Sequence, residues 1–129
     1  MTTARRFSPA DLAELERAKI LGVRAGATHR HTGVWVVVVE RRVFVRSWND
    51  KPTGWYRALV AEPRGSITFG GKAARELAVH ARPVRSARLR AAVSAAYARK
   101  YDTPSSLTWV RGFADPSREA TTLELVPAE

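Results

Sequence analysis

Positions 46–57 hold the side chains that are best suited to binding an anionic ligand. Arg46, Ser47 and Lys51 supply a guanidinium fork, a hydroxyl donor and a point charge, which are groups that recognise phosphate and carboxylate. We expect a strand to end and a short helix to begin within this stretch, and the N–H groups at a helix N-terminus attract negative charge. The pattern therefore predicts an anion-binding strand-to-helix junction.

Aromatic residues in the same stretch extend this prediction to a flat ligand. Trp48, Trp55 and Tyr56 could form the walls around a planar ring. The same residues have a purely structural interpretation, in which Trp55 and Leu59 pack a short helix on a sheet. Arg46 could equally be a solvated arginine, and the spacing alone does not decide between these alternatives.

The histidines do not predict a metal site. His29 and His31 alternate along an extended segment, a spacing that two metal ligands could use. A third ligand, His80, would have to come from another strand, so we interpret the pair as loop histidines and predict no metal.

The sequence also lacks a P-loop, a GxGxxG, a GxSxG and an HExxH motif, and no local signature supports a Ser/His/Asp triad.

The charge balance narrows the range of partners. The 129 residues include 22 Lys+Arg and 12 Asp+Glu, which gives a formal net charge of +10. No block of five or six like charges occurs, and the dominance of arginine over lysine fits the codon bias of a GC-rich genome. Nucleic-acid binding is therefore not our preferred interpretation.

The absence of cysteine excludes disulfides, a thiolate nucleophile and cysteine-bound metals.

Hydropathy predicts a chain that does not span a membrane. The longest apolar run has six residues, positions 34–39, against roughly 20 for a membrane-spanning helix. We read no signal peptide at the N-terminus and expect a cytoplasmic protein.

The first half of the chain predicts a helix followed by a hairpin. Ser8 and Pro9 are typical of a helix start, and Gly22 of a helix end. Residues 23–33 resemble a loop or an irregular strand. Strands are expected at 34–39, which is apolar on both faces, and at 43–48. The intervening Glu-Arg-Arg lacks glycine and asparagine, so we expect a longer or bulged connection.

The second half adds further strands and helices. We predict helices over 55–61 and 86–101 and strands over 66–69, 73–83 and 121–126, and make no assignment for 107–118. The order favours antiparallel pairing over a Rossmann sheet. The expected fold is therefore α+β and mainly antiparallel β, a single domain over 1–129 built as a five- or six-stranded barrel with peripheral helices. The N-terminal helix, within 1–22, would pack on that barrel.

These segments resemble the FMN-binding split β-barrel superfamily. The resemblance covers roughly residues 24–127 and is carried by the strands at 34–39 and 43–48, the Gly-Trp-Tyr-Arg-Ala-Leu segment, the Ser-Ile-Thr-Phe-Gly-Gly-Lys segment and the terminal strand. The chain looks like a small bacterial group of unknown function, similar to the deazaflavin-dependent nitroreductases. The resemblance implies a six-stranded split barrel, a homodimer, and a deazaflavin or FMN cofactor at the dimer interface.

The resemblance also implies a set of cofactor contacts. Arg46, Ser47 and Lys51 would meet the cofactor phosphate. Trp55 and Tyr56 would lie near the cofactor or line the adjoining pocket, and Arg30 and Thr32 would add contacts just before the first barrel strand. The chain departs from the nitroreductase pattern in the segment 28–33 and lacks the paired glycines after Ser47.

Three functions follow as hypotheses. The first is a flavin- or deazaflavin-binding protein that supports hydride transfer, with the reactivity supplied by the cofactor. The second is a split barrel that binds or interacts without catalysis. The third is nucleic-acid binding through the basic surface, for which affinity would fall steeply with salt.

Overall fold

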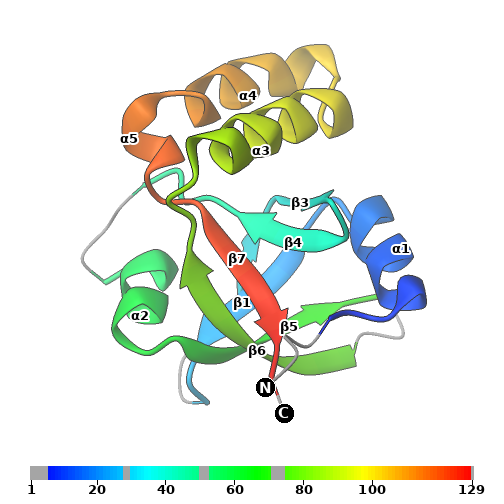
Figure 1. Ribbon diagram of the computed structural model, residues 1–129, viewed down its shortest axis with the longest axis vertical. Helices are drawn as coiled ribbons and strands as arrows, with labels where there is room; N and C mark the ends of the chain where they lie inside the picture. Colours follow the sequence, from blue (N-terminus) through cyan, green and yellow to red (C-terminus); the bar gives the residue numbers. More distant parts are fainter. Residues whose placement is uncertain (1–5, 28–29, 50–52, 71–74, 129) are drawn as a thin grey trace.

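The barrel is one antiparallel sheet of seven strands. The computed structural model describes residues 6–27, 30–49, 53–70 and 75–128. The sheet order is β2-β1-β5-β6-β7-β4-β3, and every pair is antiparallel. The predicted α+β, mainly antiparallel class is confirmed, with seven strands in place of six (Figure 1). The strands are β1 Leu21–Ala25, β2 Thr32–Val34, β3 Val36–Val39, β4 Arg42–Val45, β5 Arg64–Phe69, β6 Arg75–Pro83 and β7 Leu123–Pro127.

Trp35 divides the apolar run into two strands, so that the two edges of a nearly closed barrel are consecutive in the chain. β2 and β3 are the two edges of the sheet, yet they are joined through this single residue. The backbone groups freed by the bend are bonded to side chains: Tyr97 donates its hydroxyl to the Trp35 carbonyl at 3.2 Å, and Tyr101 accepts from the Val36 N–H at 3.1 Å. Buried backbone groups need such partners, so these tyrosines make the bend possible.

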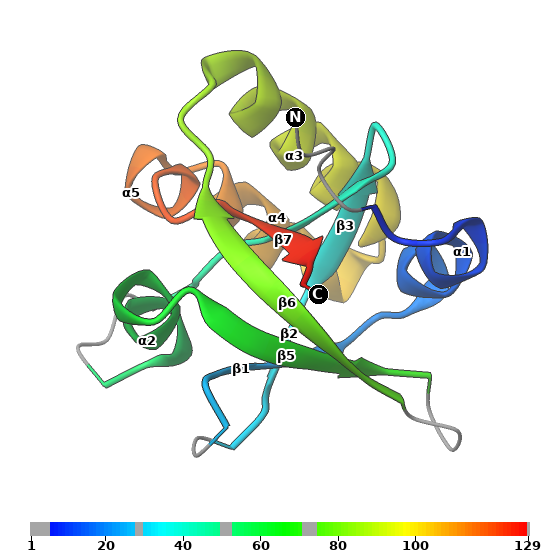
Figure 2. The ribbon, with the colours of Figure 1, turned by 60° about the horizontal axis from the view of Figure 1, so that its bottom comes forward.

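Helices cover the ends and sides of the barrel. Figures 1 and 2 show α1 and α2 on opposite sides, with α3, α4 and α5 grouped together at one end. The helices are α1 Pro9–Arg17, α2 Trp55–Ala61, α3 Ala87–Lys100, α4 Leu107–Phe113 and α5 Pro116–Glu119, with a 3-10 turn at Pro104–Ser106. The unassigned segment 107–118 thus forms α4 and most of α5. None of the helices in the described ranges is long and apolar enough to cross a bilayer.

Two apolar clusters explain why residues 34–39 are hydrophobic on both faces. Val36 points into the barrel cluster with Val43 and Val45, whereas Val37 and Phe44 lie in a second cluster under α3. Alternate residues of a strand face opposite sides, so this strand is covered twice, as the sequence predicts.

The N-terminal helix ends earlier than predicted. It begins at Pro9, capped by the Ser8 hydroxyl, and ends at Arg17 rather than at Gly22. Gly22 lies in β1, where an added Cβ would sit 2.3 Å from Oγ1 of Thr68. Close approach of β5, rather than helix termination, requires glycine there.

The hairpin connection was also predicted wrongly. Val39 pairs with Arg42, so only Glu40 and Arg41 form the turn. Both have left-handed backbones, with φ of 54° and 62°. This is the geometry of a tight type I′ turn, which normally uses Asn and Gly. Glu40 gains an ion pair with Arg88 of α3 at 2.7 Å, a contact that the local sequence does not reveal.

Candidate functional site

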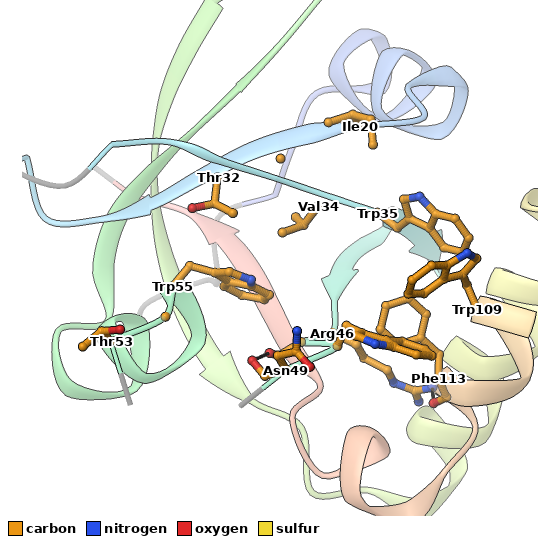
Figure 3. Close-up of a pocket in the computed structure, with 14 residues that line it drawn as sticks. Ile20, Thr32, Val34, Trp35, Arg46, Asn49, Thr53, Trp55, Trp109 and Phe113 are labelled. Atoms are coloured by element: carbon orange, nitrogen blue, oxygen red, sulfur yellow. Dashed lines mark hydrogen bonds between the residues drawn. The ribbon is translucent and has the colours of Figure 1, made fainter. Parts of the chain in front are cut away.

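A cavity of about 610 Å³ opens between α2, α4 and the strands β2 and β4 (Figure 3). Its volume lies within the range of about 300–1,000 Å³ that is typical of ligand pockets. All four tryptophans of the chain line it. The lining residues are Ile20, Thr32, Gly33, Val34, Trp35, Arg46, Ser47, Trp48, Asn49, Thr53, Gly54, Trp55, Trp109 and Phe113.

Separate elements supply the walls. Trp55, the first residue of α2, faces the cavity from one side, and Trp35, Trp109 and Phe113 face it from the other (Figure 3). Val34 on β2 lies between these two walls, and Thr32 lies on the side of Trp55. The cavity therefore has aromatic surfaces on two sides, which suits a planar ligand.

Ring contacts hold the wall formed by α4 and β4 in place. Trp35 stacks on Tyr101 with ring centroids 4.0 Å apart and planes 2° apart. Trp48 packs edge-on against Trp109 at 4.6 Å and against Phe113 at 5.5 Å. Such contacts favour particular ring orientations, so contacts within the protein position the rings of this wall.

Arg46 lies at the floor of the cavity with its donors engaged by the protein. Only 1% of the residue is exposed. Its guanidinium donates to four neutral acceptors, with distances of 2.6–2.8 Å: the Thr122 and Ser94 hydroxyls and the Phe113 and Arg90 carbonyls. Burial lowers the pKa of Arg46, with Tyr97 and Glu119 opposing that effect. It is therefore not a solvated arginine.

Ser47 is similarly engaged. Its N–H donates to Oγ1 of Thr121 at 2.9 Å and its hydroxyl to the carbonyl of Asn49 at 2.7 Å. These bonds hold the strand end and the start of the following loop. In this geometry, Ser47 shapes the floor of the cavity.

A smaller hollow of about 180 Å³ adjoins the cavity, and two arginines line it. The two share Thr32, Thr53, Gly54 and Trp55 in their linings. The hollow adds the exposed Arg30, together with Arg24, whose guanidinium pairs with Glu76 at 2.7 Å.

The predicted contacts divide among these places. Thr32, Arg46, Ser47 and Trp55 share the cavity lining, and Arg30 lies in the adjoining hollow. Tyr56 is in neither lining; it packs against the barrel core and edge-on to Trp55 at 6.3 Å.

The structure does not place Lys51 or the complete histidine pair in the site. Lys51 and His29 lie outside the described residues. His31 Nε2 lies 3.2 Å from the Ser66 hydroxyl and 3.4 Å from Glu76, and His80 is exposed on β6. Within the described ranges, no three His, Cys, Asp or Glu side chains are grouped to hold a metal.

Sequence reasoning missed Trp35, Trp109 and Phe113 as cavity residues. Trp35 interrupts a run of valines, which was a possible signal for a bend. Trp109 and Phe113 are four residues apart and so share one face of α4, but that segment had no assigned structure.

Comparison with solved structures supports the barrel. HutZ, the heme storage protein from Vibrio cholerae, matches with a TM-score of 0.66 at 17% identity, covering 96% of this chain and 92% of that one. A conserved hypothetical protein from Mycobacterium tuberculosis matches with a TM-score of 0.60 at 13% identity, covering 99% and 84%. An FAD-binding protein from Mesorhizobium loti matches with a TM-score of 0.50 at 12% identity, covering 99% and 94%. At these identities, the likeness concerns the fold alone.

Sequence comparison identifies the family. No curated protein matches the chain. The model of a family described as an uncharacterized protein conserved in bacteria, DUF2255, matches residues 10–125. That span includes every strand of the barrel except the last two residues of β7, and all the residues that line the cavity. The chain therefore belongs to the DUF2255 family.

Proposed function

We propose that this protein binds a flavin-type cofactor, FMN or a deazaflavin, in the tryptophan-lined cavity. The observation that carries the proposal is the convergence of all four tryptophans on one cavity of about 610 Å³. A tricyclic ring offers two flat faces, and aromatic walls on two sides can cover both. The FAD-binding neighbour has the same fold.

The adjoining hollow is the proposed exit for an anionic cofactor tail. Thr32, Thr53 and Gly54 lie in both linings, so a tail that leaves the cavity over these residues would reach the hollow. Arg30 would then meet the phosphate, and Lys51 remains a candidate for the same role. We assign Arg46 and Ser47 to shaping the floor, because their donors are engaged.

Hydride transfer is the chemistry that a bound flavin or deazaflavin supplies. The chain's own part would be to orient the ring between Trp55 and the opposite aromatic wall and to exclude water from it. We therefore propose an oxidoreductase role.

The cavity suits a flavin better than a heme. Heme iron takes an axial ligand such as His, Cys, Met or Tyr. Among the described residues, none of these four types lines the cavity. HutZ is named for heme storage, so heme is the competing ligand to test.

We further propose that a second copy of the chain covers the cavity rim. Ile20 and Trp109 both line the cavity and are 55% and 48% exposed, and exposed apolar side chains that gather around one cavity are typical of an interaction site. Light scattering should report a dimer that Ile20→Asp converts to a monomer. A wild-type monomer at every concentration would contradict this arrangement.

A cofactor titration tests the proposal. FMN, a deazaflavin, FAD and hemin are added separately, and tryptophan fluorescence and ligand absorbance are recorded. FMN or the deazaflavin should quench the tryptophans and shift its own spectrum. Trp55→Ala should weaken that binding about tenfold or more, because aromatic stacking contributes about 1–3 kcal/mol per ring in nucleic-acid complexes. Val60→Ala, an exposed position on the same helix, is the matched control.

Two outcomes would overturn the proposal. A spectral shift with hemin and none with either flavin would identify a heme protein. No response to any cofactor would favour a split barrel that interacts without redox chemistry.

A further inference from the structure

Two arginines lie at the aromatic wall of the cavity, and within the described ranges neither forms an ion pair with a carboxylate. Arg46 lies at the floor, and Arg118 lies against Trp48. Arg42, by contrast, forms an ion pair with Glu124 at 2.7 Å. Two carboxylates act on these arginines without an ion pair, Glu119 on Arg46 and Asp115 on Arg118.

Arg46 is the buried member of the pair. All four of its acceptors are hydroxyls or carbonyls, which satisfy its N–H groups without forming an ion pair. Two charged side chains also act on it, Glu119 favourably and Arg90 unfavourably. A charge in a low-dielectric interior acts over longer distances than one in water.

Arg118 adds a second positive charge to the same wall. Its guanidinium carbon lies 3.7 Å from the Trp48 ring centroid, and it donates to the carbonyls of Trp48 at 3.0 Å and Gly112 at 3.2 Å. A cation stacked on a ring draws on the negative potential of its π-system. The surface that Trp48 contributes to the cavity is therefore less negative than that of a free indole.

We propose that the cavity selects planar aromatic ligands that carry negative charge on or near the ring, because Arg46 and Arg118 give its aromatic wall a positive potential. This deepens the proposed function and rests on it only in taking this cavity as the ligand site. The preference would hold for any aromatic anion, including an electron-rich cofactor ring or an aromatic substrate.

A matched pair of fluorescent probes tests the proposal on the wild-type protein. N-phenyl-1-naphthylamine is neutral, and 1-anilinonaphthalene-8-sulfonate is the same ring system with a sulfonate. The sulfonate should bind about tenfold more tightly, as expected for a charge close by in a medium of intermediate dielectric constant. Trp109→Ala should weaken both probes, which verifies that they occupy the cavity.

Salt dependence distinguishes an effect of the two wall arginines from an effect of the general surface charge of this +10 protein. Surface charges are screened over about 3 Å at 1 M salt, against about 10 Å at 0.1 M, whereas buried charges are screened much less. The preference for the sulfonate should therefore persist in 1 M salt. Equal binding of the two probes, or a preference that disappears in 1 M salt, would overturn the proposal.

Substitutions of Arg118 and Arg111 test whether the preference for the sulfonate probe arises at the aromatic wall. Arg118→Gln keeps a planar amide beside Trp48 but removes the charge, so it should reduce the preference several-fold, and Arg118→Lys should retain most of it. Arg111→Gln removes an equal charge from the exposed face of α4 and should leave the preference unchanged. Equal effects of Arg118→Gln and Arg111→Gln would contradict the assignment. A protein that binds no flavin but keeps this probe preference would refute only the proposed function.

Discussion

Lys100 places its ammonium group between α1 and β3, where burial alters its ionisation. It donates to the carbonyls of Leu15 at 3.1 Å and Val36 at 2.7 Å. Burial lowers its pKa from 10.5 to about 8, opposed by Glu16. Because the folded state then binds this proton less tightly than the unfolded state, the contribution of Lys100 to stability increases as pH rises from about 8 to about 10.5.

This predicts a pH effect that one variant should remove. Urea unfolding of the wild type should show stability rising between pH 8 and 10 relative to Lys100→Met, which lacks the titrating group. The comparison stops near pH 10, because burial raises the pKa of Tyr101 to about 12 and tyrosine ionisation in the unfolded state then lowers the stability of both proteins. A constant difference between the two proteins over this window would contradict the prediction.

Tyr101 is the residue whose hydroxyl supports the bend at Trp35. It accepts from the Val36 N–H at 3.1 Å and donates to the Lys19 carbonyl at 2.7 Å. Tyr101→Phe leaves that buried N–H without a partner, so we expect a loss of about 1–3 kcal/mol in the free energy of unfolding. Tyr56→Phe is the control, since its hydroxyl has no hydrogen bond in the described ranges, and it should change little. Equal losses would contradict this role.

At the scale of elements, the β3–β4 turn has left-handed backbones at two residues that are not glycine. Arg41 has a φ of 62°, a conformation that costs most residues roughly 1–2 kcal/mol and glycine very little. Arg41→Gly should therefore stabilise the protein by about 1 kcal/mol in urea unfolding, while Arg41→Ala, which keeps the strain, should not. Equal stabilities of the two variants would show that the turn is unstrained.

The helix α4 needs Gly112 because Trp48 packs on it. An added Cβ would lie 2.1 Å from the Trp48 ring. Gly112→Ala should destabilise the fold by about 1–3 kcal/mol through overpacking, although alanine favours helices. Thr108→Ala on the exposed face of α4 should have little effect. A stabilised Gly112→Ala protein would mean that Trp48 can move aside at no cost.

Local sequence signals predicted the elements that depend on local chemistry. Ser8 and Ser86 cap α1 and α3 as expected, and α2 begins at Trp55 and ends at Ala61 as predicted. The bend at Trp35 could not be predicted, because the backbone groups there are bonded by Tyr97 of α3 and Tyr101 at the end of that helix, more than sixty residues away. Gly22 was misassigned because its reason is a contact with β5 rather than a helix end.

At the scale of the whole molecule, the site is more distributed than the sequence indicates. Four of the 14 lining residues, Thr32, Arg46, Ser47 and Trp55, were among the predicted contacts. They could be predicted because they are neighbours in the stretch 46–57 or are implied by the family resemblance. Trp35 and Trp109 join them only through the closure of the barrel and the packing of α4. Among 18 arginines, residue type cannot distinguish the buried Arg46 from the solvated ones, so its structural role appears only in three dimensions.

The central claim is that all four tryptophans enclose one ligand. A nitrogen-15 spectrum of the labelled protein should contain one indole N–H signal for each of Trp35, Trp48, Trp55 and Trp109. On titration with FMN or a deazaflavin, all four signals should shift along a common binding curve, because each ring lines the same cavity. Binding that leaves the four indole signals in place, or that moves only one of them, would contradict the account.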